Sequence, residues 1–231
     1  MKIGILETGV PPADLVARFG DYGAMFEHLL GASAFEWVHF NVQAGELPKR
    51  AEACDGYLIT GSAAGVYDPE PWIGQTERFL HEAKGKAALV GVCFGHQLMA
   101  QAFGGKVIKS PKGWGVGLHR YEVRHRRPWM DGAKSIAAPA SHQDQVVEAP
   151  PATAVLAGSD FTPLGMLAYD DQPAVSIQLH PEFDPAYARA LIELRRGRYG
   201  EDEAAAAIAS LGKPDDRARL GGWIGGFLAG A

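Results

Sequence analysis

The first half of the chain alternates short apolar runs with longer amphipathic segments. The short runs, which are of strand length, cover residues 2–7, 35–41, 56–60 and 87–92. The last of these runs is continuously apolar, as expected for a central strand buried on both faces. Between them, residues 13–30 and 71–83 place apolar side chains at helical spacing, and Pro71 suits a first helical turn. This alternation predicts βα units built around a mostly parallel sheet.

The pattern changes after residue 103, where a helix predicted over residues 94–103 ends at two glycines. Short strands separated only by turns then cover residues 106–109, 118–124, 146–148, 154–158, 166–169 and 174–179. Strands without helices between them indicate a partly antiparallel extension of the sheet. Helices are predicted over residues 185–198, 201–211 and 215–228. Because no linker or composition break divides the chain, we expect one domain over residues 1–231, with residues from about 200 to 231 as a helical extension.

The composition of the 231 residues, 47% hydrophobic and 21% charged, is that of a chain able to bury a sizeable core. The net charge is −5, and the one basic run, Arg124–Arg127, is short, so a surface for nucleic acid is not indicated. The first residues contain no apolar export segment, and no apolar stretch approaches about 18 residues. We therefore expect a soluble, cytoplasmic protein that binds neither nucleic acid nor membrane.

One cysteine lies in a pattern that favours reactivity. Of the two, Cys54 and Cys93, only Cys93 is flanked by glycines, in the stretch Gly91-Val92-Cys93-Phe94-Gly95 at a strand-to-helix junction. Such glycines relieve crowding around a sharply turned nucleophile, and the helix N-terminus favours the thiolate. The sequence therefore predicts a cysteine nucleophile at residue 93, whereas Cys54 is expected to be structural.

A base and its orienting group follow the last predicted strand, in His180-Pro181-Glu182. Residues two apart in an extended segment face the same side, so His180 and Glu182 can reach into one cleft. Ligands bind at the carboxyl ends of parallel strands, where both Cys93 and His180 fall. A cysteine nucleophile needs a histidine and a third group that orients it. These residues therefore predict a Cys93–His180–Glu182 triad.

The stretch GVCFGHQLMAQAFGGKV together with LHPEF resembles the class I (triad) glutamine amidotransferases, close to the amidotransferase portion of GMP synthase and its free-standing relatives. The resemblance implies an α/β fold with a flavodoxin-like, open, mostly parallel sheet, helices on both faces and a small antiparallel extension. It also implies that Cys93, His180 and Glu182 are the catalytic residues.

Further roles are implied by the same resemblance. Thr60-Gly61-Ser62 resembles the family's oxyanion turn, in which the backbone N–H of Gly61 pairs with that of Phe94. Residues expected to contact substrate are Ser62, Gln97, Ser141, His142 and Gln143, the last three within a loop, Ser141–Asp144, that grips the amino-acid end of glutamine. Trp114 is equally consistent with lining the pocket or with packing.

The implied reaction is hydrolysis of the γ-glutamyl amide of glutamine through a thioester on Cys93. A separate synthase partner could accept the released ammonia, because no phosphate-binding loop of a nucleotide-activating domain follows. A second interpretation is a γ-glutamyl peptidase using the same triad, and a third is a non-catalytic DJ-1-like protein, a class that lacks the His-Pro-Glu segment.

No metal or organic cofactor is expected. Five histidines have no metal-ligand spacing: His28, His39, His81, His119 and His125. His96, inside the helix after Cys93, is expected to lie behind the site and not in it.

Overall fold

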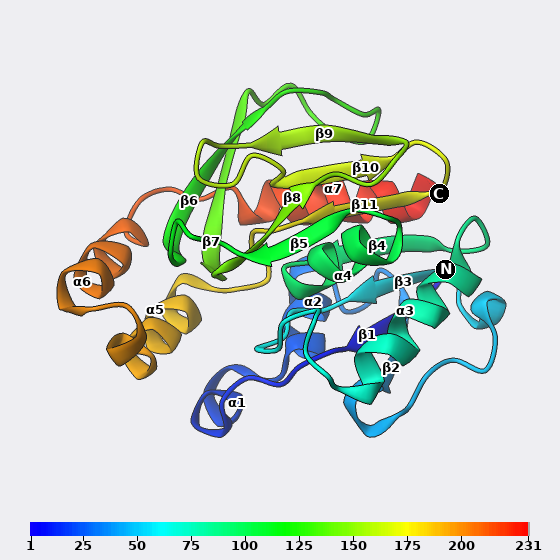
Figure 1. Cartoon of the computed structure of the whole chain (residues 1–231), viewed down its shortest axis with the longest axis horizontal. Helices are drawn as coiled ribbons and strands as arrows, with labels where there is room; N and C mark the ends of the chain where they lie inside the picture. The colour runs from blue at the N-terminus through cyan, green and yellow to red at the C-terminus, as the bar shows by residue number, and fades with distance from the viewer. Residues whose placement is uncertain (231) are drawn as a thin grey trace.

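The computed structural model describes residues 1–230, and within them the strands form a nine-stranded sheet and a separate two-stranded sheet. The order in the large sheet is β2-β1-β3-β4-β11-β10-β9-β6-β7 (Figure 1). Its first five strands are parallel: β1 (Lys2–Glu7), β2 (Glu36–Asn41), β3 (Gly56–Ile59), β4 (Ala88–Val92) and β11 (Ala174–Ile177). The mostly parallel sheet expected from the apolar runs is confirmed.

The antiparallel extension is confirmed as well. It consists of β6 (Gly115–Val123), β7 (Ser135–His142), β9 (Thr153–Gly158) and β10 (Met166–Tyr169), while β5 (Lys106–Lys109) and β8 (Asp144–Glu148) pair separately. Strand β7 was not predicted. Its sequence, SIAAPASH, is rich in alanine and contains Pro139, features unusual in a strand. Pro139 is tolerated because β7 is the edge strand of the sheet.

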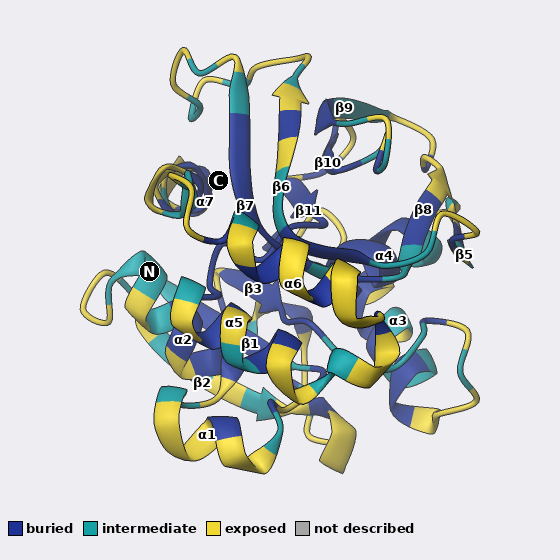
Figure 2. Ribbon diagram, turned by 90° about the vertical axis from the view of Figure 1, so that its left-hand side faces the viewer, coloured by how far each residue is buried: buried dark blue, intermediate teal, exposed yellow. Residues whose placement is uncertain are grey.

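Helices cover both faces of the sheet, and alternate residues of a strand therefore enter different clusters. On one face Leu58 and Val90 pack with α2 (Tyr22–Leu30) and α7 (Arg217–Gly230). On the other face Ile59 and Leu89 pack with α3 (Pro71–Ala83) and α4 (Phe94–Ala102). A third cluster joins α1 (Ala13–Phe19), α5 (Pro185–Leu194) and α6 (Glu201–Ser210) to β6. Figure 2 shows α1, α5 and α6 with exposed outer faces.

The helix predicted over residues 13–30 is two helices, and this correction has a local cause. Gly20 adopts φ 81°, which ends α1, and the Asp21 side chain accepts a hydrogen bond from the Ala24 N–H to begin α2. Three short 3₁₀ turns complete the chain: η1 (Val42–Ala44), η2 (Ala51–Ala53) and η3 (Arg196–Arg198).

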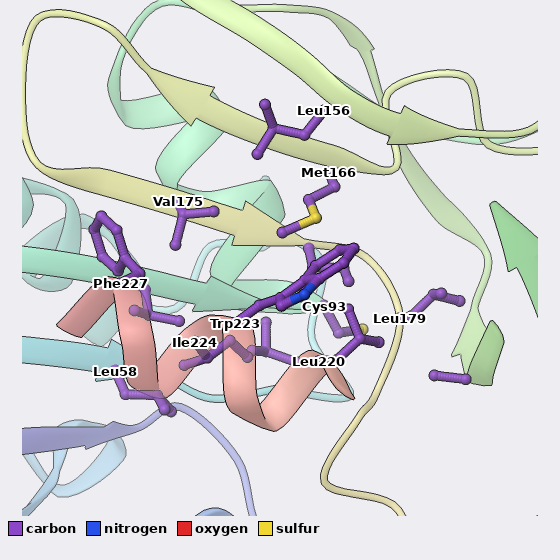
Figure 3. Packing of buried hydrophobic residues seen from close by; sticks show 14 of the residues in the cluster. Leu58, Cys93, Leu156, Met166, Val175, Leu179, Leu220, Trp223, Ile224 and Phe227 are labelled. Carbon is purple, nitrogen blue, oxygen red and sulfur yellow. The ribbon is translucent and has the colours of Figure 1, made fainter. Parts of the chain in front are cut away.

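The last helix, α7, is part of the core. Its Leu220, Trp223, Ile224 and Phe227 are buried with Cys93 in the same cluster. Figure 3 shows these side chains beneath the strands, with Cys93 and Leu179 at one end of the group. No helix within residues 1–230 is long and apolar enough to cross a membrane.

Candidate active site

Cys93 is the N-cap residue of α4, held in a backbone conformation that non-glycine residues rarely adopt, φ 52° and ψ −102°. The neighbouring glycines leave no room for a side chain. A Cβ on Gly95 would lie 2.3 Å from the Ile59 carbonyl oxygen, and one on Gly91 would lie 2.5 Å from the Gly95 carbonyl oxygen. The Gly-x-Cys-x-Gly pattern is therefore explained by close backbone packing around a sharply turned residue.

The side chain of Cys93 is 4% exposed, yet it forms part of the wall of a cavity of about 350 Å³. This cavity, termed here the main cavity, is lined by Ser62, Ala63, Ala64, Gly65, Tyr67, Asp68, Cys93, Gln97, Lys109, Trp114, Ser141, His142, Gln143, Asp144, Arg195 and Arg198. Its volume falls in the range of small-molecule sites, about 300–1,000 Å³.

His180 comes to the same place through strand pairing. Strand β11 is parallel to β4 with Ile177 opposite Val92, and the Cys93 N–H donates to the Ile177 carbonyl at 2.9 Å. The chain beyond β11 then turns, and the His180 N–H donates to the Pro139 carbonyl of β7 at 2.8 Å. Residues far apart in sequence therefore meet at the carboxyl edge of the parallel strands, as expected for a ligand site.

His180 and Glu182 form a buried pair, with His180 Nδ1 2.7 Å from Glu182 Oε1. The His180 ring also stacks on Phe183, with 3.9 Å between ring centroids and 7° between planes. These two contacts fix the orientation of the imidazole and leave its Nε2 directed elsewhere.

The pKa of His180 is shifted strongly upward. Burial disfavours the charged ring, but the nearby Cys93 sulfur and the Glu182 carboxylate outweigh it and raise the pKa of His180 to about 10. Both neighbours therefore favour the imidazolium over the neutral ring.

The turn after β3, which contains Gly61, lies against His180 and Cys93. Thr8 anchors it, with its Oγ1 donating to the Thr60 carbonyl at 2.8 Å, and the Gly95 N–H donates to the same carbonyl at 3.1 Å. A Cβ on Gly61 would lie 3.0 Å from His180 Cε1. Among residues 1–230, no hydrogen bond uses the backbone N–H of Gly61 or Phe94. Gly61 lines a narrow recess beside the main cavity, whereas Phe94 lines neither of these spaces.

The five predicted substrate contacts, Ser62, Gln97, Ser141, His142 and Gln143, all line the main cavity. Gln97 Nε2 donates to the Asp144 carbonyl at 2.9 Å and to Gln178 Oε1 at 3.1 Å. The segment expected to be a loop is instead the corner between two strands. Ser141 and His142 end β7 and Asp144 begins β8, because the unpredicted β7 extends to the site.

His142 is uncharged. Burial lowers the pKa of His142 to about 3, and its Nδ1–H donates to the Asp144 carbonyl at 3.1 Å. The Nε2 atom, which is then an acceptor, is buried without a partner in the described chain. This atom faces Gly115, where a Cβ would lie 2.9 Å from it, and Gly115 does not line the main cavity.

Several lining residues were not predicted, among them Tyr67, Lys109, Arg195 and Arg198. Tyr67 donates to Asp144 Oδ2 at 2.9 Å. These four residues come from a loop, a strand end, a helix C-cap and a 3₁₀ turn, and no local sequence pattern marks them. Trp114, for which the sequence left two interpretations, satisfies both: it lines the main cavity and packs edge-on against Tyr199, with 5.4 Å between centroids.

Other candidate residues lie away from the main cavity. His96 is fully buried behind Cys93, with Nδ1 2.8 Å from Ser176 Oγ, and burial lowers the pKa of His96 to about 3. Cys54 is buried in the cluster on the α3 face. Residues 1–230 contain no grouping of three or more His, Cys, Asp or Glu side chains that could hold a metal ion.

Comparison with known proteins identifies the family of this chain. The family model "Glutamine amidotransferase class-I" matches residues 25–193. Gamma-glutamyl peptidase 4 of Arabidopsis thaliana is 31% identical over 190 residues, covering 78% of this chain and 75% of the relative. A subunit of the glutamine-hydrolysing GMP synthase of Methanopyrus kandleri is 34% identical over 137 residues, covering 57% of this chain and 68% of the relative.

The fold agrees over the whole length. The crystal structure of a glutamine amidotransferase from Thermotoga maritima superimposes with a TM-score of 0.78 at 17% identity, covering 99% of this chain and 96% of that one. The glycine-flanked cysteine, the sheet order and these matches lead to one conclusion: the chain belongs to the class-I glutamine amidotransferase family.

Proposed function

We propose that this protein hydrolyses γ-glutamyl amide bonds through a thioester on Cys93. One observation carries the proposal: Cys93 lies in the wall of the main cavity, next to His180, whose Nδ1 lies 2.7 Å from the buried Glu182 carboxylate. A nucleophile, a proton donor and an orienting carboxylate are together the requirements for covalent acyl transfer.

In the first half-reaction the Cys93 thiolate attacks the γ-carbonyl carbon and a C–S bond forms. The resulting oxyanion accepts hydrogen bonds from the Gly61 and Phe94 N–H groups, which together stabilise the transition state by several kcal/mol, since one such donor is worth about 3–4 kcal/mol elsewhere. His180 then gives its proton to the departing nitrogen, and the C–N bond breaks.

In the second half-reaction water attacks the thioester. His180, now neutral, accepts a proton from that water, the C–S bond breaks, and glutamate leaves with Cys93 restored as a thiolate. Glu182 accepts a hydrogen bond from Nδ1 throughout, so Nε2 is the atom that moves protons. No step requires a group beyond these residues and water.

The glutamyl end of the substrate would lie against Gln97, Ser62 and the β7–β8 corner. The Asp144 carboxylate in the wall of the main cavity suits the substrate's α-ammonium group. Ser141 Oγ, which is buried without a partner in the described residues, suits the substrate's carboxylate.

Two substrate classes remain for this chemistry, glutamine and larger γ-glutamyl amides. The main cavity, about 350 Å³, reaches from the residues placed at the glutamyl end to Arg195 and Arg198, which favours a leaving group larger than ammonia. A related protein named gamma-glutamyl peptidase supports that choice, whereas the GMP synthase relative supports ammonia transfer to a separate synthase partner. The DJ-1-like alternative does not account for the His180–Glu182 pair.

The test is to treat the protein with a glutamine-like diazoketone, which alkylates a thiolate poised to attack a γ-carbonyl. We expect one adduct, on Cys93, and loss of γ-glutamyl hydrolysis in Cys93→Ala. Cys54→Ala is the matched control: it removes the other buried thiol and should keep both labelling and activity. Hydrolysis that survives Cys93→Ala, or an adduct on Cys54, would refute the proposal.

A further inference from the structure

Arg195 is a cation placed at the active site by the helix that follows the proposed triad. Helix α5 starts directly after His180-Pro181-Glu182, with the Asp184 side chain capping it through the Ala186 N–H at 2.8 Å. Arg195 is the C-cap residue, and its backbone N–H donates to the Leu191 and Ile192 carbonyls, each at 3.1 Å. One short, capped helix therefore fixes the position of Arg195 relative to His180.

The guanidinium of Arg195 has no anionic partner. Its side chain is half-buried, and within residues 1–230 no carboxylate lies within ion-pair distance of it and no side-chain hydrogen bond uses it. The next residue contrasts with it: Arg196 binds Glu193 and Glu201 through contacts of 2.7 Å each and lines none of the cavities around the site. A partly desolvated, unpaired guanidinium is suited to a carboxylate ligand.

Arg195 also lies on the side of the site where a leaving group must lie. It lines the main cavity, and it lines an adjoining narrow recess together with Tyr22, Gly61, His180 and Leu191. His180 must face the scissile nitrogen to protonate it. The recess holds only about 10 Å³, room for about one water, so a group attached to that nitrogen extends from His180 into the main cavity, whose wall also contains Arg195.

We infer that Arg195 binds a carboxylate carried by the leaving amine, so that the preferred substrates are γ-glutamyl amino acids or peptides and not glutamine or neutral γ-glutamyl amides. The inference rests on the proposed function, because it uses His180 to define the leaving-group side. Arg195 is a specificity-determining residue in this assignment, and Arg198, exposed at the rim of the main cavity, adds positive charge on the same side.

A different role for Arg195, binding the α-carboxylate at the glutamyl end, makes a separable prediction. That carboxylate is present in every γ-glutamyl substrate, so loss of its contact would weaken all substrates equally. Binding of the leaving-group carboxylate affects only the substrates that carry one. A pair of substrates of the same size, one anionic and one neutral at the leaving group, therefore separates the two roles.

The experiment compares γ-glutamylglycine with γ-glutamylglycinamide. For the unmodified protein we expect kcat/KM to be about 10- to 100-fold higher for γ-glutamylglycine, the usual effect of one charge-assisted contact. In Arg195→Gln the ratio should fall to about one, through loss of γ-glutamylglycine hydrolysis alone. Arg196→Gln, the matched control on the same turn, should keep the ratio of the unmodified protein.

A ratio near one in the unmodified protein, or an equal loss for both substrates in Arg195→Gln, would overturn the inference while leaving the thioester chemistry intact. Calorimetric binding to Cys93→Ala tests the role of Arg195 independently of the thioester chemistry, because this variant cannot form a thioester. Tighter binding of γ-glutamylglycine that disappears in Cys93→Ala/Arg195→Gln supports the role of Arg195 even where turnover is absent. Absence of turnover by the unmodified protein with both substrates and with glutamine counts against the proposed function.

Discussion

At the scale of single residues, neighbouring groups determine the backbone conformation of Cys93 and the pKa of His180. Cys93 keeps a positive φ because Gly91 and Gly95 let the backbone pack tightly around it. Burial of His180 by itself would lower the pKa of its ring, but Cys93 and Glu182 raise that pKa. Burial supplies the low dielectric in which these charges act strongly, so each side chain depends on the other two.

Glu182→Gln tests this dependence. Without the carboxylate the pKa of His180 falls, and the imidazolium is lost at lower pH. We expect the alkaline limb of the kcat/KM profile to move to lower pH and the maximum to fall by about 10²- to 10⁴-fold. The profile should be measured with γ-glutamylglycine, beside the exposed Glu148→Gln as control. An unchanged alkaline limb in Glu182→Gln would mean that Glu182 does not control the charge of His180.

At the scale of secondary-structure elements, side-chain contacts hold neighbouring strands and helices together. The edge of the parallel sheet is held to α2 by His39 of β2, whose Nδ1 and Nε2 lie 2.7 Å from Glu7 of β1 and Glu27 of α2. Partial burial opposes charge on this ring, but the two carboxylates outweigh it and raise the pKa of His39. Positive charge on His39 therefore strengthens contacts that join β1, β2 and α2.

The sign of the resulting pH dependence follows from linkage. Because the folded pKa is raised, the stabilisation is fully present below about pH 6.5, the unfolded value, and is lost as pH rises through the folded pKa. We expect His39→Gln to lower the free energy of unfolding more at about pH 6 than at about pH 9, measured by urea denaturation. His125→Gln, in an exposed loop where the ring bonds only the Val155 carbonyl, is the control. A difference independent of pH would show that the ring is neutral when folded.

At the scale of the whole molecule, the site lies where three packed regions meet. Cys93 belongs to the cluster beneath α7, Phe94 to the cluster under α3 and α4, and Phe183 to the cluster formed by α1, α5 and α6. Helix α7 thus closes one face of the sheet that supports the cysteine. Its buried side chains belong to the core cluster that contains Cys93.

Trp223→Ala tests the contribution of α7. Trp223 is 3% exposed, and its truncation should lower the free energy of unfolding by about 3–5 kcal/mol, the usual cost of deleting a buried aromatic side chain. Leu194→Ala, at a site 52% exposed, should change it by less than about 0.5 kcal/mol. Urea denaturation measures both variants. A loss below about 1 kcal/mol for Trp223→Ala would place α7 outside the core.

The sequence alone determined those features that neighbouring residues encode. Apolar runs predicted the parallel strands, Pro71 and Ala83 bounded α3 correctly, and the glycines around Cys93 predicted the sharp turn. The division of residues 13–30 into two helices could have been anticipated from Gly20-Asp21, a helix stop followed by an N-cap.

Only the tertiary structure decided features that depend on packing between distant segments. Strand β7 was not predicted because it contains Pro139 and several alanines. It forms because it pairs with β6, and its last residues, Ser141 and His142, line the main cavity. Arg195 and Arg196 are adjacent and of the same residue type, yet Arg195 lines the main cavity whereas Arg196 binds acidic side chains. Local sequence carries periodicity and turn preferences, whereas the surroundings of a side chain are set by whichever elements pack against it.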